Sequence, residues 1–320
     1  LIFNLTFVSS AQAAATFVDS FSVATQDTNP RGLTFNNDGT KMFVSGNDGD
    51  DVNEYTLTNG FDVSSATFVG SFSVATQDTK PQGIAFNNDG TKMFVVGNAG
   101  NDVNVYTLST GFDLTSTVNH VLEFDISGQD TAPRGITFNN DGTKMFVAGN
   151  IGDDINEYTL SIGFDLTSTV NFVDSFDISG QDAAPQGIVF NNDGTKMFVA
   201  GNDGDDINEY TLTTGFDVSS ATFVDSFDIS SQEETPQGIA FNNDGTKIFV
   251  LGITGDDINE YTLSCAFKVT ASSTCDAPPK IKEVRGIVDA QINTAKNFAK
   301  DSSQSALKRL SILRANKYHN

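Results

Sequence analysis

The chain repeats one seven-residue motif five times, and this repeat limits the possible folds more than any other feature. The motif Phe-Asn-Asn-Asp-Gly-Thr-Lys begins at Phe35, Phe86, Phe138, Phe190 and Phe241. The successive starts are 51, 52, 52 and 51 residues apart. A period near 50 is typical of solenoids and β-propellers, in which each repeat forms one supersecondary unit.

Each repeat contains four short runs with the composition of β-strands. In the first repeat they cover residues 32–35, 41–44, 52–57 and 67–74. The Asn-Asp-Gly after the first run predicts a hairpin, because Asn and Gly tolerate a positive φ. The second run is continuously apolar, as expected of a strand buried on both faces. The third mixes β-branched, aromatic and polar residues, which predicts an outer strand that is partly exposed to solvent.

The two ends of the array distinguish a solenoid from a propeller. Residues 16–23 form a lone strand-like run before the first complete repeat, and the last repeat ends after three runs, at 258–263. One strand and three strands make one blade, so the N-terminal strand is expected to complete the last blade and close a ring. An open solenoid would need capping repeats, and none is visible. We therefore predict an all-β fold, a five-bladed propeller of four-stranded blades over residues 14–278.

The segment Phe-Asn-Asn-Asp-Gly-Thr-Lys-Met-Phe-Val resembles the blade signature of lactonase-like and TolB-like propellers, Phe-Ser-Pro-Asp-Gly-x-x-Leu-Tyr-Val. Asn-Asn stands here where that signature has Ser-Pro. The resemblance covers about residues 16–263. It implies the propeller fold, and because the signature is a hairpin it implies nothing about chemistry.

The charge of the chain divides it into two parts. The whole sequence has 41 acidic and 18 basic residues, a net charge of −23. Residues 279–320 hold 9 basic and 3 acidic residues (net +6), so residues 1–278 hold 9 basic and 38 acidic (net −29). The acidic part argues against a nucleic-acid partner, which would need clustered Lys and Arg. The change of sign predicts a module boundary near residue 279.

The N-terminus and the cysteines both predict export. Residues 1–8 are apolar and are followed by Ala11-Gln12-Ala13, the small-x-small pattern of a signal-peptidase site. Residues 1–13 are therefore interpreted as a truncated signal peptide, with an apolar mature N-terminus as the alternative. Cys265 and Cys275 are the only cysteines. In an exported chain this spacing predicts one local disulfide, with two free thiols as the alternative.

Residues 279–320 are expected to form an α-helical tail, because apolar residues recur there at intervals of three and four. The stretch from Val284 to Phe298, followed by Leu307 to Arg314, resembles the helical linker that precedes the outer-membrane barrel of autotransporters. That resemblance implies a surface-displayed passenger, held at the outer membrane by a barrel encoded beyond residue 320. The alternative is an amphipathic helix that packs on a partner.

Two loops of each repeat carry the candidate ligand-binding residues, and in a four-stranded blade they share one face. The loop before the innermost strand supplies one polar residue per blade to an axial mouth: Arg31, Gln82, Arg134, Gln186 and Gln237. The loop between the second and third strands supplies an acidic ring: Asp50, Asp51, Asp102, Asp153, Asp154, Asp205, Asp206, Asp256 and Asp257.

Three interpretations of the acidic ring stay open. Asp and Asn can simply make the turns. Closely spaced carboxylates can also bind Ca²⁺, which prefers oxygen ligands. The five-fold repetition would also suit a glycan, with a tyrosine from each repeat as stacking platform: Tyr55, Tyr106, Tyr158, Tyr210 and Tyr261.

A non-enzymatic binding module is the function that these residues favour. A catalytic site needs different residues that converge once, whereas the five repeats are nearly interchangeable. With two histidines in the chain, no Ser-His-acid set is visible. The expected role is therefore binding at the cell surface by an exported passenger. The alternative is a secreted propeller hydrolase of the lactonase type.

Overall fold

Twenty strands form five four-stranded antiparallel sheets in the computed structural model, which describes residues 15–270 and Cys275. Blade 1 consists of β2 (Pro30–Phe35), β3 (Lys41–Gly46), β4 (Asp51–Leu57) and β5 (Ala66–Ser73). Blade 2 consists of β6 (Pro81–Phe86), β7 (Lys92–Gly97), β8 (Asp102–Leu108) and β9 (Val118–Asp125). Blade 3 consists of β10 (Pro133–Phe138), β11 (Lys144–Gly149), β12 (Asp154–Leu160) and β13 (Val170–Asp177).

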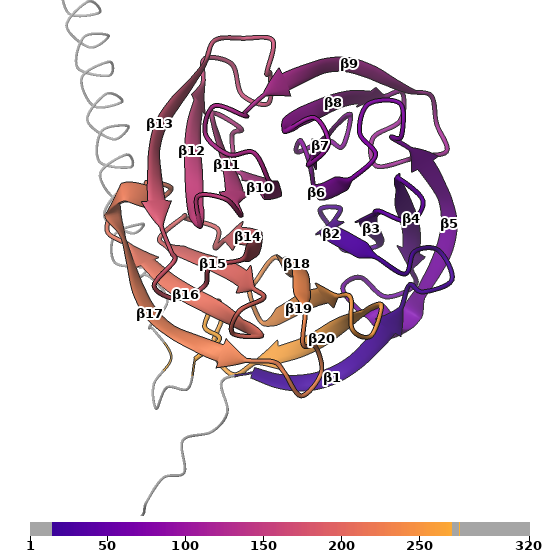
Figure 1. Ribbon diagram of the computed structural model, residues 1–320. Coiled ribbons are helices and arrows are strands. Elements are labelled where there is room, and N and C mark those ends of the chain that lie inside the picture. Colours follow the sequence, from indigo (N-terminus) through magenta and orange to yellow (C-terminus); the bar gives the residue numbers. More distant parts are fainter. Residues whose placement is uncertain (1–14, 271–274, 276–320) are drawn as a thin grey trace, which may run out of the picture. The chain divides into compact units, whose positions relative to one another are not determined.

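The remaining two blades complete the ring (Figure 1). Blade 4 consists of β14 (Pro185–Phe190), β15 (Lys196–Gly201), β16 (Asp206–Leu212) and β17 (Ala221–Asp228). Blade 5 consists of β18 (Pro236–Phe241), β19 (Lys247–Gly252), β20 (Asp257–Leu263) and the N-terminal β1 (Ala15–Ser22). β1 pairs antiparallel with β20, from Ala15 opposite Leu263 to Ser22 opposite Asp257. The predicted closure by the N-terminal strand is therefore confirmed, because β1 supplies the fourth strand of blade 5.

The repeated motif forms the hairpin between the two innermost strands of each blade. In blade 3, Gly142 has a φ of +70°, a conformation that an L-residue adopts at a cost. The site is also sterically closed, because a Cβ on Gly142 would lie 2.2 Å from the ring of Phe164. The Asp141 carboxylate accepts hydrogen bonds from the backbone N–H and the hydroxyl of Thr143. The hairpin thus uses the Asp for the turn and the Gly for close approach of an aromatic ring.

The second strand of each blade is buried as predicted, but the prediction for the third strand is wrong. Met42, Phe43 and Val44 of β3 are fully buried. The third strand β4 was expected to be partly solvated, yet Glu54 is only 1% exposed. The fourth strand covers it, and its polar groups are paired: the Glu54 carboxylate accepts a hydrogen bond from Lys41 Nζ at 2.7 Å. The strand that faces solvent is instead the fourth. In blade 1 this strand is β5, and most of its residues are exposed.

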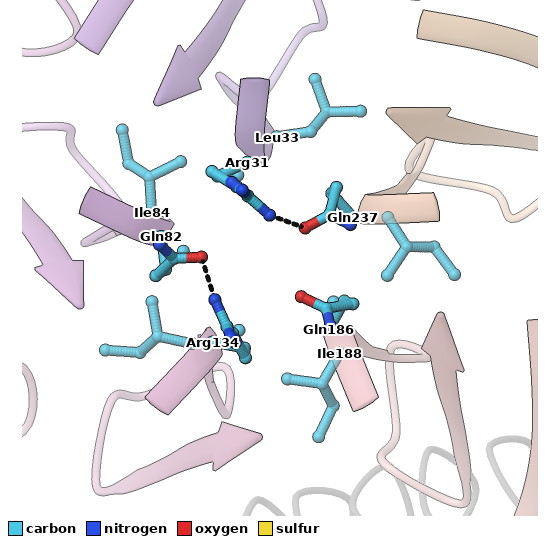
Figure 2. Close-up of a pocket in the computed structure, with 15 residues that line it drawn as sticks. Arg31, Leu33, Gln82, Ile84, Arg134, Gln186, Ile188 and Gln237 are labelled. Carbon is cyan, nitrogen blue, oxygen red and sulfur yellow. Dashed lines mark hydrogen bonds between the residues drawn. The ribbon is translucent and has the colours of Figure 1, made fainter. Parts of the chain in front are cut away.

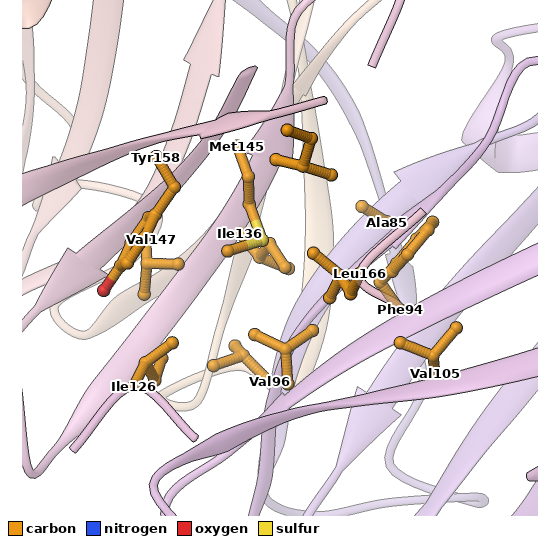
Figure 3. Close-up of a cluster of buried hydrophobic side chains, with 12 residues drawn as sticks. Ala85, Phe94, Val96, Val105, Ile126, Ile136, Met145, Val147, Tyr158 and Leu166 are labelled. Atoms are coloured by element: carbon orange, nitrogen blue, oxygen red, sulfur yellow. The ribbon is translucent and has the colours of Figure 1, made fainter. Parts of the chain in front are cut away.

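The hydrophobic core lies between neighbouring blades rather than inside a single sheet. Figure 3 shows the cluster between blades 2 and 3, where Phe94 and Met145 are fully buried. The rings of Phe94 and Phe138 lie 4.6 Å apart, one from each blade. Equivalent clusters join the other blades, so each blade buries its apolar faces only with both neighbours in place.

The predicted disulfide is confirmed, and two other predictions lie outside the described residues. Cys265 and Cys275 are bonded, with their Cα atoms 5.1 Å apart. The signal peptide of residues 1–13 and the helical tail of 279–320 are not among the residues that the structure describes. Within the described ranges the only helical elements are two 3₁₀ turns, η1 (Val63–Ser65) and η2 (Val218–Ser220). None of the described helices could cross a membrane.

Candidate functional site at the axial mouth

The innermost strand of each blade begins at the propeller axis and places one polar side chain there. These side chains are the predicted set, Arg31, Gln82, Arg134, Gln186 and Gln237, and the structure brings all five together around one opening (Figure 2). Each follows the proline that starts its strand and precedes a glycine. A Cβ on Gly135 would lie 2.4 Å from the backbone oxygen of Gln186. The glycines therefore allow neighbouring innermost strands to converge, and this convergence makes the opening narrow.

The mouth is small, and an apolar constriction closes it from below. Its cavity volume is about 20 Å³, which is room for about one water-sized group. Two residues further along each innermost strand, an aliphatic side chain lines both the mouth and the cavity next to it: Leu33, Ile84, Ile136, Ile188 and Ile239. That cavity is wider, about 200 Å³, and is lined by aliphatic, aromatic, Thr and Asn residues. A ligand at the mouth can insert only one small polar group.

Hydrogen bonds make the five-residue ring asymmetric. Arg31 Nη1 donates to Gln237 Oε1 at 2.8 Å, and Arg134 Nη1 donates to Gln82 Oε1 at 2.9 Å. The Gln186 amide nitrogen donates to the backbone oxygen of Ala184 at 3.1 Å. Because a guanidinium has five N–H donors, each arginine keeps donors beyond the one it gives to its glutamine.

Two arginines carry positive charge at the mouth, and carboxylates of the surrounding loops, those of Asp27, Asp48 and Asp130, interact with them electrostatically. Burial lowers the pKa of Arg31, and the nearby charge of Arg134 lowers it further. Burial also lowers the pKa of Arg134. Both guanidinium groups stay charged near neutral pH, since the ordinary pKa of arginine lies far above neutrality. The residues that line the mouth are Arg, Gln, Gly, Leu and Ile, with no carboxylate among them. An oxyanion in the opening would therefore offset two like charges.

The acidic loops lie on the same face, as predicted, because one carboxylate per blade connects them to the loops of the mouth. Asp27 accepts hydrogen bonds from the backbone N–H groups of Asn29, Asp48 and Gly49. Its counterparts bridge the same two loops in the other blades: Asp78, Asp130, Asp182 and Glu233. The sequence shows these residues as a repeated Gln-Asp or Gln-Glu, and that repetition is the signal that could have identified them.

The predicted acidic ring divides into two structural roles. The first residue of each pair adopts a positive φ and makes the turn: Asp50, Asn101, Asp153, Asp205 and Asp256. The second accepts a hydrogen bond from an Asn two residues later: Asp51, Asp102, Asp154, Asp206 and Asp257. Burial raises the pKa of Asp102 and of Asp154 to about 6. Within the described part of the chain, no three His, Cys, Asp or Glu side chains are grouped as metal ligands. Calcium binding at the ring stays a prediction.

The tyrosines that were expected to offer sugar-stacking platforms are buried. Tyr55, Tyr106 and Tyr210 have no exposed surface, and Tyr158 is 3% exposed. Each ring packs edge-on against aromatic residues, as Tyr55 does against Phe21 at 5.6 Å. A sugar cannot stack on them without opening the blade, so glycan binding, which stays a prediction, would have to use other residues.

Comparisons with known proteins find distant similarity to solved structures and assign no roles to residues. No protein-family model matches the chain, and no curated protein does either. A functionally unknown protein from Desulfotomaculum acetoxidans aligns with 18% identity and a TM-score of 0.47, over 73% of this chain and 69% of its own. The periplasmic gluconolactonase of Pseudomonas aeruginosa aligns with 15% identity and a TM-score of 0.43, over 73% and 66%. A luciferin-regenerating enzyme aligns with 12% identity and a TM-score of 0.47, over 76% and 95%.

The expectation that the chain is not an enzyme is corrected. Two of the similar structures bear the names of enzymes, a luciferin-regenerating enzyme and a gluconolactonase. The physical premise was also wrong. Near-identical repeats were taken to exclude a convergent site, yet all five deliver a residue to one axial mouth, with Arg in two blades and Gln in three.

Proposed function

We propose that the protein is an exported propeller hydrolase of the lactonase type, with the axial mouth as its active site. The observation that carries this proposal is the pair Arg31 and Arg134. Both are partly buried and flank one opening of about 20 Å³ whose lining has no carboxylate. That opening suits the carbonyl group of a small lactone, with the rest of the lactone ring outside.

The arginines would act on the charge that develops during ring opening. Water adds to the carbonyl carbon and gives up a proton to the solvent, and the carbonyl oxygen becomes an oxyanion. Guanidinium N–H groups already aimed at that oxygen stabilise it, because little reorganisation is needed. The C–O bond of the lactone then breaks, the ring oxygen takes a proton, and the product is a hydroxy acid. Since the mouth supplies no general base, the attacking water comes from the solvent side.

The test is lactone hydrolysis by the full chain, followed with a pH indicator and glucono-δ-lactone. Replacing either arginine, R31Q or R134Q, should lower kcat/KM by about 100-fold, the usual effect of removing one oxyanion donor. The control is N192A, because Asn192 donates to the backbone of Asn243 outside the lining of the mouth. A parent protein no faster than the uncatalysed reaction, or arginine variants with parental rates, would overturn the proposal.

Export is part of the proposal, and the disulfide supports it. A bond such as Cys265–Cys275 forms and persists in oxidising compartments. Display at the outer membrane as an autotransporter passenger would be a more specific location. It depends on residues 279–320, and secretion of the full chain compared with a chain ending at residue 278 would test it.

A further inference from the structure

Blade 2 differs from the other four blades at one position of its outermost strand, β9. The third strand of every blade carries an asparagine, and in blade 2 the residue opposite it across the sheet makes the pair Asn104 and Glu123. The other four blades have a serine there: Ser20, Ser71, Ser175 and Ser226. In blades 1, 4 and 5 that serine forms a hydrogen bond with a neighbouring aspartate. An ionised glutamate has no proton to donate, so blade 2 gains a negative charge and loses a donor.

Four oxygen-bearing side chains of blade 2 share one face of its sheet. Residues directly opposite each other, and residues two apart in one strand, point to the same side. Asp102 lies opposite Asp125, and Asn104 lies opposite Glu123. Tyr106 continues this face and packs against blade 1. The four polar groups therefore lie together on the side of blade 2 that faces blade 1.

One of these groups is buried and lacks a partner. Asn104 has no exposed surface, and its Nδ2 donates to Asp102 Oδ1 at 2.7 Å. That bond fixes the amide, because a rotation by 180° would place Oδ1 against the carboxylate. Within the described residues, Asn104 Oδ1 is enclosed and has no hydrogen-bond partner, and none of the four equivalent asparagines has such an oxygen. An enclosed carbonyl oxygen without a donor is costly and indicates a water, an ion or a ligand.

The carboxylates around this oxygen repel one another at neutral pH. Burial, followed by the charges of Asp78, Glu123 and Asp125, raises the pKa of Asp102 to about 6. A divalent cation among these carboxylates would offset the repulsion. It would also give the Asn104 oxygen a partner, because carbonyl oxygens ligate hard cations. One occupant would thus satisfy both the charge and the enclosed oxygen.

We propose that blade 2 binds one Ca²⁺ between the carboxylates of Asp102 and Glu123 and the Oδ1 atom of Asn104, with water completing the coordination. Oxygen ligands on flexible side chains suit Ca²⁺, whereas Mg²⁺ demands near-ideal octahedral geometry. Within the described residues no three His, Cys, Asp or Glu side chains are grouped as metal ligands, so Asp78 and Asp125 contribute charge and not coordination. The site occurs once per chain, in contrast to a five-fold ring, and lies outside the lining of the axial mouth.

The test is thermal unfolding of the full chain in about 5 mM CaCl₂, compared with NaCl of equal ionic strength, which screens charge without a specific ligand. CaCl₂ should raise the Tm of the parent by about 3 °C, as expected for a submillimolar Kd, and isothermal titration should give one Ca²⁺ per chain. The variant E123S installs the serine of the other four blades, so it should fold, and it should lose both signals. The control D174N removes an exposed carboxylate from the outermost strand of blade 3 and should keep both.

A Tm shift in E123S equal to that of the parent would overturn the proposal, because the effect would then arise elsewhere on the acidic surface. A parent without a shift, or with about five Ca²⁺ per chain, would overturn it as well. MgCl₂ at the same concentration should give a smaller shift, and an equal shift would overturn the assignment to Ca²⁺. Lactone hydrolysis does not enter this test, so failure of the proposed function would leave the inference standing.

Discussion

Blades 2 and 3 have the same strands and the same hairpins but differ in how each joins the following blade. In blade 3, Lys144 Nζ lies 2.7 Å from a Glu157 oxygen, and the other Glu157 oxygen accepts a hydrogen bond from the Val218 N–H of blade 4 at 3.0 Å. In blade 2, Val105 replaces this glutamate and pairs with Leu122 across the sheet. In blade 3, the residue opposite Glu157 across the sheet is Asp174, where blade 2 has Leu122.

The difference shows that the connection between neighbouring blades has a constant part, the lysine, and a variable part, the glutamate. Lys92 Nζ donates to the backbone oxygen of Phe164, as Lys144 does to Phe216. In blades 1, 3, 4 and 5 a buried glutamate accepts a backbone N–H from the next blade. At blade 2 the equivalent donor, the buried Leu166 N–H, has no acceptor in the described part of the chain. Apolar packing of Val105 thus takes the place of a polar connection.

Converting blade 3 to the blade 2 pattern with E157V should have the largest effect. The change leaves Lys144 without its carboxylate and the Val218 N–H without its acceptor, in a site where Glu157 is 2% exposed. A buried N–H without an acceptor costs about 1–3 kcal/mol, and Lys144 adds little because its side chain is 27% exposed and keeps its bond to Phe216 O. Urea unfolding of the parent and the variant measures it. The exposed E123Q is the control and should change stability by less than about 0.5 kcal/mol. A loss below 1 kcal/mol would mean that packing alone holds this connection.

The pH dependence of stability should be similar in the two blades, because both contain an aspartate with a raised pKa. For Asp102 and Asp154 the pKa is about 6, chiefly because of burial, against the ordinary 3.8. The folded state therefore binds a proton more tightly than the unfolded state. This contribution adds stability as the pH falls through about 6, and it levels off near 4.

The variants D102N and D154N should separate the pH-dependent part of the stability from the part contributed by the Lys–Glu connection between blades. Each removes a buried charge, and Asn can still accept the hydrogen bond from the Asn two residues later. At pH 7 each should be more stable than the parent by about 1–2 kcal/mol, and the advantage should vanish by pH 4. Thermal unfolding from pH 4 to 7 measures it. An advantage that does not change with pH would contradict the assignment of the raised pKa to these two residues.

The sequence predicted the ring and the axial set because both depend on one position per repeat. The Phe-Asn-Asn-Asp-Gly-Thr-Lys hairpin and the lone strand before it determine blade number and closure, and Arg31 with its four equivalents follows from where innermost strands begin. The burial of Glu54 was missed because its partner Lys41 is 13 residues away and meets it only through sheet register. The pairing of Arg31 with Gln237 and of Arg134 with Gln82 was missed because these partners are 206 and 52 residues apart in sequence.

The variant V105E gives blade 2 the glutamate that the other four blades have. Of the changes compared, it should have the smallest effect on stability. The new carboxylate would meet Lys92 and the Leu166 N–H, both already in place. The gain from satisfying them is reduced by the lost packing of Val105 on Leu122 and by desolvation of the carboxylate. We expect a net gain of about 0.5–1 kcal/mol in urea unfolding. Adding L122D, the pattern of blade 3, should not increase that gain, because among the described residues the Asp174 carboxylate accepts a hydrogen bond from the Ser175 N–H and none from the Glu157 side chain. If V105E instead destabilises the protein, the apolar pair is the better connection at this position, and the four glutamates would then be retained for correct pairing of blades rather than for stability.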